Sequence, residues 1–271
     1  MDVPLLEGDH LTKSFPARTA SGEDFKAVDD VSITLGPGQC LAVIGESGSG
    51  KTTLTGLLLG SLRPDGGRVV YRGQEVAPGS AGLSLLRRES SVVFQNPFGS
   101  LDPRWTVARS VSEPLTARAG RRRGGEDLEG AVRRILAEVR LDPDEYMYRY
   151  PVDLSGGQAQ RVAIARALIS RPRVLLADEP MSAIDVSARV QILSTLRSVM
   201  AGARRQARQE EGQAMGMILV SHDLGVVQHI ADRILVLHSG RVVETGTTGQ
   251  VLDHPQEAYT RRLIEAASLD C

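Results

Sequence analysis

The stretch GESGSGKT, Gly45 to Thr52, decides the fold of this chain. It follows the apolar run Cys40 to Ile44 and precedes a leucine-rich segment, so it predicts a strand, a glycine-rich loop and a helix. The spacing fits GxxxxGK[S/T], in which glycines let successive backbone N–H groups surround phosphate oxygens at a helix N-terminus. In such a loop Lys51 would reach the β- and γ-phosphates, and Thr52 would ligate Mg²⁺.

Lysine is rare in this chain, which strengthens the interpretation of Lys51. Arginine supplies 29 of the 32 basic residues (32 minus 3), and the three lysines are Lys13, Lys26 and Lys51. A compact ammonium on a flexible stem fits inside a phosphate loop better than a broad guanidinium does. The alternative is a Gly/Ser-rich turn before an ordinary helix, and the full pattern in its strand-loop-helix context disfavours it.

The composition indicates a globular chain of one large domain or two modest ones, with 41% hydrophobic residues among 271. Its net charge of −1 provides no overall basic field for nucleic acid or anionic lipid, and the run Arg118 to Arg123 is interpreted as a solvated loop. We find neither an apolar stretch of about 20 residues nor a signal peptide, so we expect a cytoplasmic protein. Cys40 and Cys271 have no metal-ligand spacing and are expected to remain thiols.

Apolar runs alternate with helical patterns along most of the chain, which predicts an α/β fold with a largely parallel sheet. Strands are expected at 5–15, 28–35, 40–44, 68–71, 91–95, 174–177, 217–220, 234–237 and 242–243. Helices are expected from Lys51 and at 83–88, 106–118, 127–140, 156–170, 186–200 and 255–267, and 204–212 should be a solvated helix extension or a mobile loop. Because strand patterns disappear between 96 and 153, we expect a helical subdomain inserted there.

Two further motifs carry polar groups that suit nucleotide chemistry. The apolar run from Val174 ends in Asp178 and Glu179, as expected where a buried strand delivers carboxylates to the carboxyl edge of a parallel sheet. Asp178 would hold Mg²⁺ through water, and Glu179 would orient and deprotonate an attacking water. This turn is weak evidence alone and becomes strong beside the phosphate loop.

The second motif, LSGGQ at 154–158, places a serine and two glycines before a predicted helix. It could bind an anion through exposed N–H groups, although one nucleotide does not need two such loops from one chain. By itself, a serine N-cap followed by a flexible glycine pair is the better interpretation.

Taken in order, GESGSGKT, Gln95, LSGGQ, LLADEP, the segment Ser182 to Asp185 and His222 resemble the ATP-binding subunits of ABC transporters. The resemblance covers almost the whole chain, and LSGGQ is its most specific part. It implies a single ABC ATPase domain over 1–271, with an α/β core at 1–95 and 154–271, an N-terminal antiparallel β region, a helical subdomain at 96–153 and a C-terminal helix at 253–271. Met181 and Ile184 depart from the usual pattern but remove no polar catalytic group.

The resemblance assigns roles by position and implies ATP and Mg²⁺ as ligands. Glu179, His222, Gln95 and Lys51 would be catalytic, and Thr52, Gln95 and Asp178 would hold the metal. His222 would contact the γ-phosphate and steady Glu179. Nucleotide binding would use Phe15 against adenine, together with Gly45, Glu46, Ser47, Gly48, Ser49, Gly50, Lys51, Thr52, Thr53, Ser155, Gly156, Gly157, Gln158 and Asp185.

In the resembled family two subunits pack head to tail, which explains the second loop. Ser155 and Gly157 would cap the γ-phosphate held by a partner subunit, and Asp185 would communicate across the dimer. The chain would therefore contribute half of each composite site. The partner could be a second copy or a related ATPase subunit.

The segment Val93 to Arg104 and the tail His254 to Leu263 resemble the oligopeptide, dipeptide and nickel importer branch, as does Arg149-Tyr150-Pro151. This resemblance implies membrane permease subunits, a separate extracytoplasmic solute-binding protein, no nucleic acid and a place on the inner face of the cell membrane. The solute itself (peptide, nickel or opine) stays open. Two alternatives are an assembly subunit like those associated with carbon–phosphorus bond cleavage, and a DNA-repair or ribosome-associated ABC protein. The second is disfavoured because the chain has neither a long coiled-coil insertion nor a tandem ATPase unit.

Overall fold

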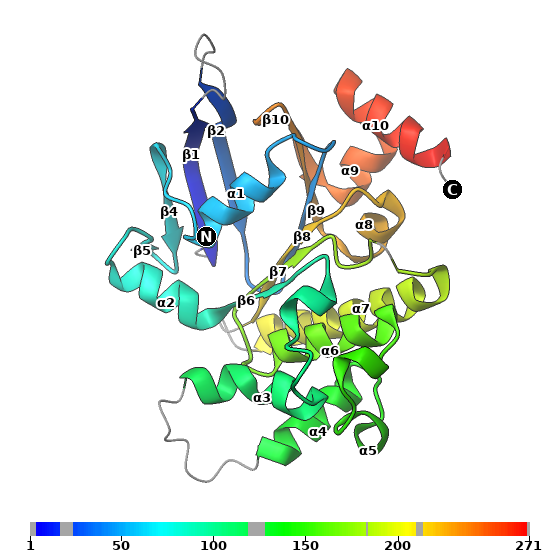
Figure 1. The fold of residues 1–271 in the computed structure, drawn as a ribbon. Coiled ribbons are helices and arrows are strands. Elements are labelled where there is room, and N and C mark those ends of the chain that lie inside the picture. Colours follow the sequence, from blue (N-terminus) through cyan, green and yellow to red (C-terminus); the bar gives the residue numbers. More distant parts are fainter. Residues whose placement is uncertain (1–3, 17–23, 119–127, 183, 210–213, 270–271) are drawn as a thin grey trace.

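The protein is described here by a computed structural model that places residues 4–16, 24–118, 128–182, 184–209 and 214–269. An antiparallel sheet forms the N-terminal part, and its strands lie in the order β2-β1-β4-β5. These strands are β1 (Leu6–Phe15), β2 (Phe25–Leu35), β4 (Gly66–Tyr71) and β5 (Gln74–Glu75). The antiparallel N-terminal region expected from the sequence is therefore present (Figure 1).

A second sheet has six strands in the order β10-β9-β3-β8-β7-β6. All its neighbouring strands are parallel except β10 and β9, which confirms the largely parallel sheet. The strands are β3 (Cys40–Ile44), β6 (Ser90–Val93), β7 (Val174–Asp178), β8 (Gly216–Val220), β9 (Arg233–His238) and β10 (Arg241–Thr247).

Successive side chains of the central strands point to opposite faces of this sheet, because a strand has a period of two. Leu41 and Val43 belong to the core on the face shared with β1, β2 and α1 (Lys51–Leu58). Cys40, Ala42 and Ile44 belong to the core on the opposite face, which helices cover. Both faces are buried, so the strands appear in the sequence as continuous apolar runs.

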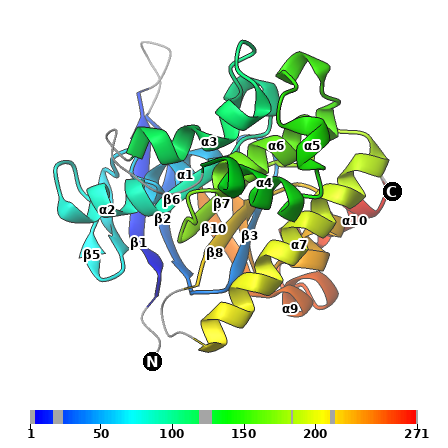
Figure 2. The same ribbon diagram turned by 90° about the horizontal axis from the view of Figure 1, so that it is seen from below.

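The helices gather mainly on that second face, as the view from below shows (Figure 2). In the described parts of 96–154 (96–118 and 128–154) the structure has only short and medium helices, as expected from the loss of strand patterns. They are η1 (Pro97–Ser100), α3 (Val107–Arg118), α4 (Leu128–Glu138), α5 (Pro143–Tyr146) and η2 (Pro151–Asp153). The remaining helices are α2 (Ala81–Glu89), α6 (Gly156–Leu168), α7 (Val186–Gln209), α8 (Leu224–Ile230), α9 (Thr248–Asp253) and α10 (Ala258–Leu269).

Two predicted boundaries, one of a strand and one of a helix, differ in the structure. The strand expected at 91–95 ends at Val93, and it is a half-buried edge strand rather than a buried one. Phe94 and Gln95 therefore lie in the exposed loop that leaves the strand. The helix expected at 186–200 continues as α7 to Gln209, so the first of the two expectations for 204–212, a helix extension, holds as far as that residue. Arg204 bonds to Asp232 across 2.8 Å and Ala203 is buried.

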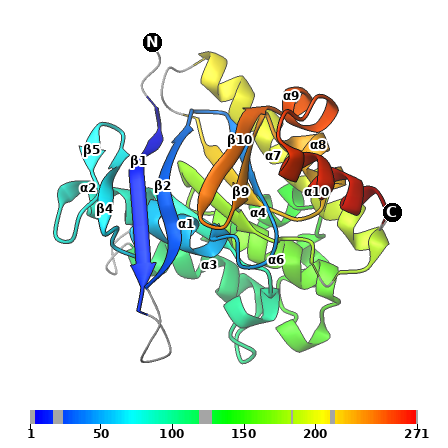
Figure 3. The ribbon, with the colours of Figure 1, turned by 90° about the horizontal axis from the view of Figure 1, so that it is seen from above.

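The C-terminal helix expected at 253–271 is present but begins later, as α10 at Ala258, and the prediction missed the separate helix α9 before it. Both helices lie beside β10 (Figure 3). Thr247 and Gln250 form a capping box that begins α9. The Glu244 carboxylate accepts the N–H groups of Gln256 and Glu257 just before α10. The prediction also missed α8, which the Asp223 side chain caps at Val226.

Some of the predictions fall outside the described residues. These are the stretch 119–123 of the arginine-rich run, residues 210–213 and Cys271. Cys40 is a buried free thiol, and burial raises its pKa. Across the described parts of the chain, we find no helix with the length and apolar character needed to cross a bilayer.

Candidate functional site

The glycine loop lies between β3 and α1 and is confined by the strands around it. A Cβ atom at Gly45 would lie 2.2 Å from the Leu237 carbonyl oxygen, and one at Gly50 would lie 2.2 Å from the Ala27 carbonyl oxygen. Both glycines also have φ values that disfavour side chains, +150° and +105°. The glycines at these two positions are therefore required by space and backbone conformation, and Gly50 directly precedes α1.

Lys51 folds its side chain back over the loop. Its Nζ atom donates to the carbonyl oxygens of Gly45 at 2.7 Å and Glu46 at 2.8 Å. Burial lowers the pKa of the Lys51 ammonium, and the carboxylates of Glu179 and Asp178 oppose that shift. The ammonium is thus half-buried beside two carboxylates, where an arriving anion would meet it.

The other loop residues differ in exposure. Glu46, Ser47, Gly48 and Thr52 are exposed, and Thr53 is half-buried. Ser49 is buried, and among the described residues its hydroxyl oxygen has no hydrogen-bond partner. The Gly240 N–H donates to the Ser49 carbonyl oxygen at 2.9 Å, so the turn between β9 and β10 supports this loop.

Asp178 is the last residue of β7, and Glu179 follows it in a left-handed conformation with φ +48°. Such a conformation is strained for a residue with a side chain, and strained residues cluster at functional sites. The Glu179 Oε2 atom lies 2.7 Å from Nδ1 of His222, and the Glu179 N–H donates to the Val220 carbonyl oxygen at 2.9 Å. The structure therefore brings Glu179 and His222 together, from the carboxyl ends of neighbouring strands.

Burial raises the pKa of the Asp178 carboxyl above its ordinary value. The negative charge of Glu179 raises this pKa further, whereas the Lys51 ammonium opposes both effects. Two adjacent carboxylates and one neighbouring ammonium leave an excess of negative charge at a partly buried position. This arrangement favours a cation as an additional ligand.

The LSGGQ stretch forms the start of α6. The Ser155 hydroxyl accepts the Gln158 N–H at 3.3 Å, and the Gln158 side chain accepts the Ser155 N–H at 2.8 Å. The serine N-cap favoured by the sequence is thus present as a capping box. Ser155 and Gly156 are exposed, while Gly157 is buried against Ala188 of α7. Because the Ser155 hydroxyl acts as an acceptor in this cap, its own proton remains available for a further acceptor.

We expect Gly157→Ala to destabilise the chain more than Gly156→Ala. A Cβ atom at Gly157 would lie 2.4 Å from the Cβ of Ala188, and a Cβ cannot rotate away, so α6 or α7 must shift. Overpacking of this kind costs about 1–3 kcal/mol of unfolding free energy. Urea unfolding of both variants measures the difference.

Gly156→Ala is the matched control, because no atom lies within 4 Å of a Cβ built at that glycine. Adding Ala188→Gly to Gly157→Ala should recover part of the lost stability by removing the clash. Equal unfolding free energies for the two alanine variants would show that the close approach of Gly157 to Ala188 does not restrict the side chain at position 157.

The remaining predicted residues lie in different settings. The Asp185 carboxylate accepts the N–H of Ala188 at 2.8 Å, which caps α7, and hydrogen bonds from Ser187 and Ala188 lower its pKa. Gln95 is exposed. Phe15 is 38% exposed at the end of β1, with the Lys13 ammonium 5.8 Å from its ring centre. The structure thus leaves Phe15 available for stacking against a ligand.

Sequence reasoning missed two residues that touch this site. Gln160 of α6 is fully buried, and its Nε2 atom donates to the Phe94 carbonyl oxygen at 3.2 Å, directly before Gln95. Tyr259 of α10 accepts the Glu46 N–H through its hydroxyl at 3.2 Å. A polar amide among the apolar residues of α6 is a signal that could have indicated Gln160. The contact of Tyr259 is tertiary and has no local signal.

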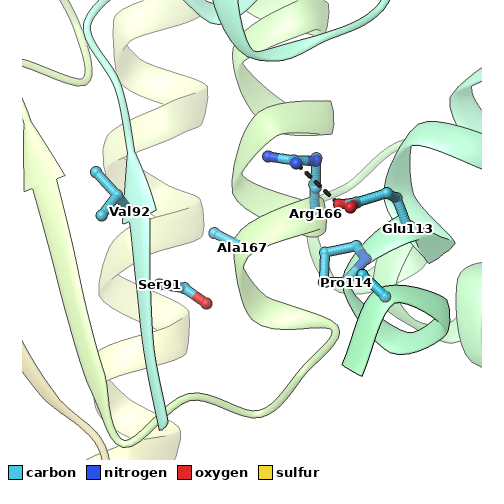
Figure 4. A pocket seen from close by; sticks show the side chains of 7 residues that line it. Ser91, Val92, Glu113, Pro114, Arg166 and Ala167 are labelled. Atoms are coloured by element: carbon cyan, nitrogen blue, oxygen red, sulfur yellow. Dashed lines mark hydrogen bonds and ion pairs between the residues drawn. The ribbon is translucent and has the colours of Figure 1, made fainter. Parts of the chain in front are cut away.

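A separate cavity of about 250 Å³ lies between β6, α3 and α6 (Figure 4). Arg166 and Glu113 face each other there across 2.9 Å, beside Ser91 and Pro114. None of the residues predicted for the nucleotide site lines it. The chemistry described above therefore lies outside this cavity.

Comparison with known proteins decides the family. The family model described as "ABC transporter" matches residues 28–182, which is more than half of the chain. The chain belongs to this family. As an ABC ATPase, it hydrolyses ATP.

Two curated ABC relatives illustrate the similarity. The dipeptide transport ATP-binding protein DppF of Escherichia coli (strain K12) is 41% identical over 270 residues, which are 98% of this chain and 77% of that protein. The glutathione import ATP-binding protein GsiA of the same strain is 39% identical over 268 residues, 97% of this chain. The chain spans 41% of the length of GsiA.

Solved ABC structures show the same fold. The dimeric ATP-binding cassette MJ0796, in a post-hydrolysis state bound to ADP and Pi, matches with a TM-score of 0.73 and 27% identity over 90% of this chain and 98% of that one. The protein cbiO1 from Clostridium perfringens, part of the ABC transporter complex cbiONQ, matches with a TM-score of 0.77 and 23% identity over 98% of each chain. These matches confirm the fold class predicted from the sequence.

Proposed function

We propose that this ABC ATPase energises a membrane importer for peptides or related small solutes. The similarity to DppF carries this proposal, because it extends over 98% of the chain at 41% identity and includes the C-terminal part beyond residue 182. The similarity to GsiA, whose name describes glutathione import, supports a solute of peptide character.

In this proposal the Gly45 to Thr52 loop holds the phosphates of ATP. The loop is confined at Gly45 and Gly50, and the Lys51 ammonium rests on two loop carbonyls that phosphate oxygens can replace as acceptors. Phe15, exposed at the end of β1, would stack on the adenine ring. Binding thus combines an anion cradle with one aromatic contact.

The residues at this site fit Mg²⁺. The cation prefers hard oxygen ligands and keeps several waters and phosphate oxygens in its shell. Thr52 is exposed at the start of α1. The negative charge of Glu179 lies close to the Asp178 carboxyl, and a cation would offset it. The side chains of Thr52, Asp178 and Gln95 would hold the ion. When bound, Mg²⁺ would offset phosphate charge during hydrolysis.

Glu179 would act as the general base toward the attacking water. The Glu179 carboxylate is held by His222 at 2.7 Å. The left-handed backbone of Glu179 breaks the extended conformation of the strand that ends at Asp178. The carboxylate orients the water and accepts its proton, while the imidazole fixes one carboxylate oxygen. His222 is 69% exposed, so its ring can also reach a phosphate oxygen.

Ser155, Gly156, Gly157 and Gln158 would serve the nucleotide of a second ABC ATPase subunit. In the described part of the chain, the hydrogen bonds of Ser155 stay within the first turn of α6, and the residue is exposed. Asp185 caps the neighbouring α7, whose Ala188 packs on Gly157. A head-to-tail dimer would therefore join the two halves of each site.

The proposal extends to the other transporter parts. Permease subunits would hold the chain at the inner face of the membrane, and a solute-binding protein would deliver the solute outside. The whole of 1–271 would form one ABC ATPase domain, with 96–153 as its helical subdomain.

Affinity purification of the tagged chain from solubilised membranes of its source cell tests this proposal. We expect integral membrane subunits to co-purify, together with ATPase activity, and a parallel purification of the Lys51→Ala variant should retain the subunits but lack the activity. Recovery with water-soluble partners alone, as for a carbon–phosphorus assembly subunit, would overturn the importer function. The mass of the ATPase pair would distinguish a homodimer from a heterodimer.

A further inference from the structure

The C-terminal helix α10 touches the nucleotide loop through one side chain. The hydroxyl of Tyr259 accepts the backbone N–H of Glu46 at 3.2 Å, although the two residues are 213 positions apart. Glu46 is the second residue of GESGSGKT, so this hydrogen bond reaches the loop at the point where it leaves β3.

The same peptide group is held from its other end by Lys51. The peptide that joins Gly45 to Glu46 presents its carbonyl oxygen to Lys51 Nζ at 2.7 Å and its N–H to the Tyr259 hydroxyl. Tyr259 and Lys51 therefore bind the two ends of one peptide group. Because peptide groups are planar, fixing the N–H also fixes the carbonyl on which the ammonium rests.

Tyr259 is itself firmly placed. Its side chain is 8% exposed, and its ring lies 4.0 Å from that of His238, the last residue of β9. The Glu244 carboxylate holds the start of α10 through two backbone N–H groups, and Arg261 donates to the carbonyl oxygen of Gln256 at 3.0 Å. The hydroxyl thus meets the loop from a fixed position.

The surrounding chain leaves this peptide little freedom. Any side chain at Gly45 would meet the Leu237 carbonyl, one residue before His238, and the Gly240 N–H donates to Ser49 further along the loop. Burial raises the pKa of the Tyr259 phenol, so the hydroxyl stays neutral at physiological pH.

We propose that Tyr259 is a positioning residue of the nucleotide site. Its hydroxyl fixes the Gly45–Glu46 peptide so that Lys51 is presented to the phosphates, and α10 is thereby a working part of that site. The proposal rests on the assignment of the Gly45 to Thr52 loop to ATP.

Tyr259→Phe tests the proposal, because phenylalanine keeps the ring and its contact with His238 and removes the hydroxyl alone. We expect the Kd of the full-length chain for MgATP to rise about fivefold, because binding must then order a peptide group that the hydroxyl no longer holds in place. The KM for ATP in the purified transporter should rise to a similar extent, while kcat at saturating ATP stays within about twofold of wild type. Isothermal titration and steady-state hydrolysis measure these values.

Tyr71→Phe is the matched control. The Tyr71 hydroxyl is also hydrogen-bonded, to Glu89 at 2.6 Å, and its side chain is fully buried at the end of β4 in the antiparallel sheet. This variant should lower the unfolding midpoint and leave the Kd for MgATP unchanged.

Three outcomes would count against the proposal. A Kd within twofold of wild type in Tyr259→Phe would overturn it, and so would an equal loss of affinity in Tyr71→Phe, which would show a general loosening of the fold. Absence of ATP binding by the wild-type chain in the same titration would instead overturn the proposed function together with this inference.

Discussion

Replacing Glu179 with glutamine should lower ATP turnover about 10³-fold, within the range that a general base contributes. The amide keeps the length of the side chain and its place beside His222, but it cannot accept a proton from water. Because ATP binding uses other residues, the variant should bind ATP with near wild-type affinity and accumulate as an ATP-bound dimer. Single-turnover hydrolysis and gel filtration with MgATP measure the two effects.

A matched control is Glu145→Gln, which removes a carboxylate that is ion-paired with Arg149 on the exposed face of the helical segment. It should leave turnover unchanged. Turnover of the Glu179→Gln variant close to that of wild type would show that another group activates the water.

The second large effect is expected for Lys51→Ala, which should weaken ATP binding at least about a hundredfold. Each hydrogen bond from a charged donor contributes about 1.5–3 kcal/mol, and every 1.4 kcal/mol changes the affinity tenfold. The variant also leaves Asp178 and Glu179 without the neighbouring positive charge, so the negative field at the site would repel the triphosphate. Titration with MgATP measures the loss.

Another of the three lysines, Lys26, provides the control for this experiment. Lys26→Ala removes a surface ammonium that is paired with Asp29 at 3.1 Å, so it should not change ATP affinity beyond experimental error. If Lys51→Ala bound ATP as wild type does, the phosphate site would have been assigned to the wrong loop.

The central sheet could be predicted from the sequence because its strands are buried on both faces. Runs such as Cys40 to Ile44 and Val174 to Ala177 are apolar at every position, and each leads directly into a motif, the glycine loop or the Asp178-Glu179 pair. The carboxyl ends of parallel strands meet at one edge, so the sequence could place Asp178 and Glu179 on the same edge of the sheet as the glycine loop. The Glu179–His222 contact agrees with the role that the family resemblance gave to His222.

Contacts made by packing could not be predicted in the same way. The half-buried strand that ends at Val93 lies at the edge of the sheet, and the sequence does not reveal strand order. The close approach of Gly157 to Ala188 depends on how α6 crosses α7. Tyr259 reaches Glu46 only because α10 packs beside β10 and the end of β9, and a helical pattern in the sequence does not show where the helix packs.

The capping box at Ser155 has a consequence for the rate at which two subunits can close. The hydrogen bond from the Gln158 N–H to the Ser155 hydroxyl fixes the serine rotamer within its own chain before any partner arrives, and the second bond of the box fixes the Gln158 side chain. Immobilising a side chain at an interface otherwise costs about 0.5–1.5 kcal/mol. In the proposed dimer this ordering is already complete when the chain has folded, so the serine meets the neighbour's triphosphate as a preorganised donor and closure need not wait for a conformational search.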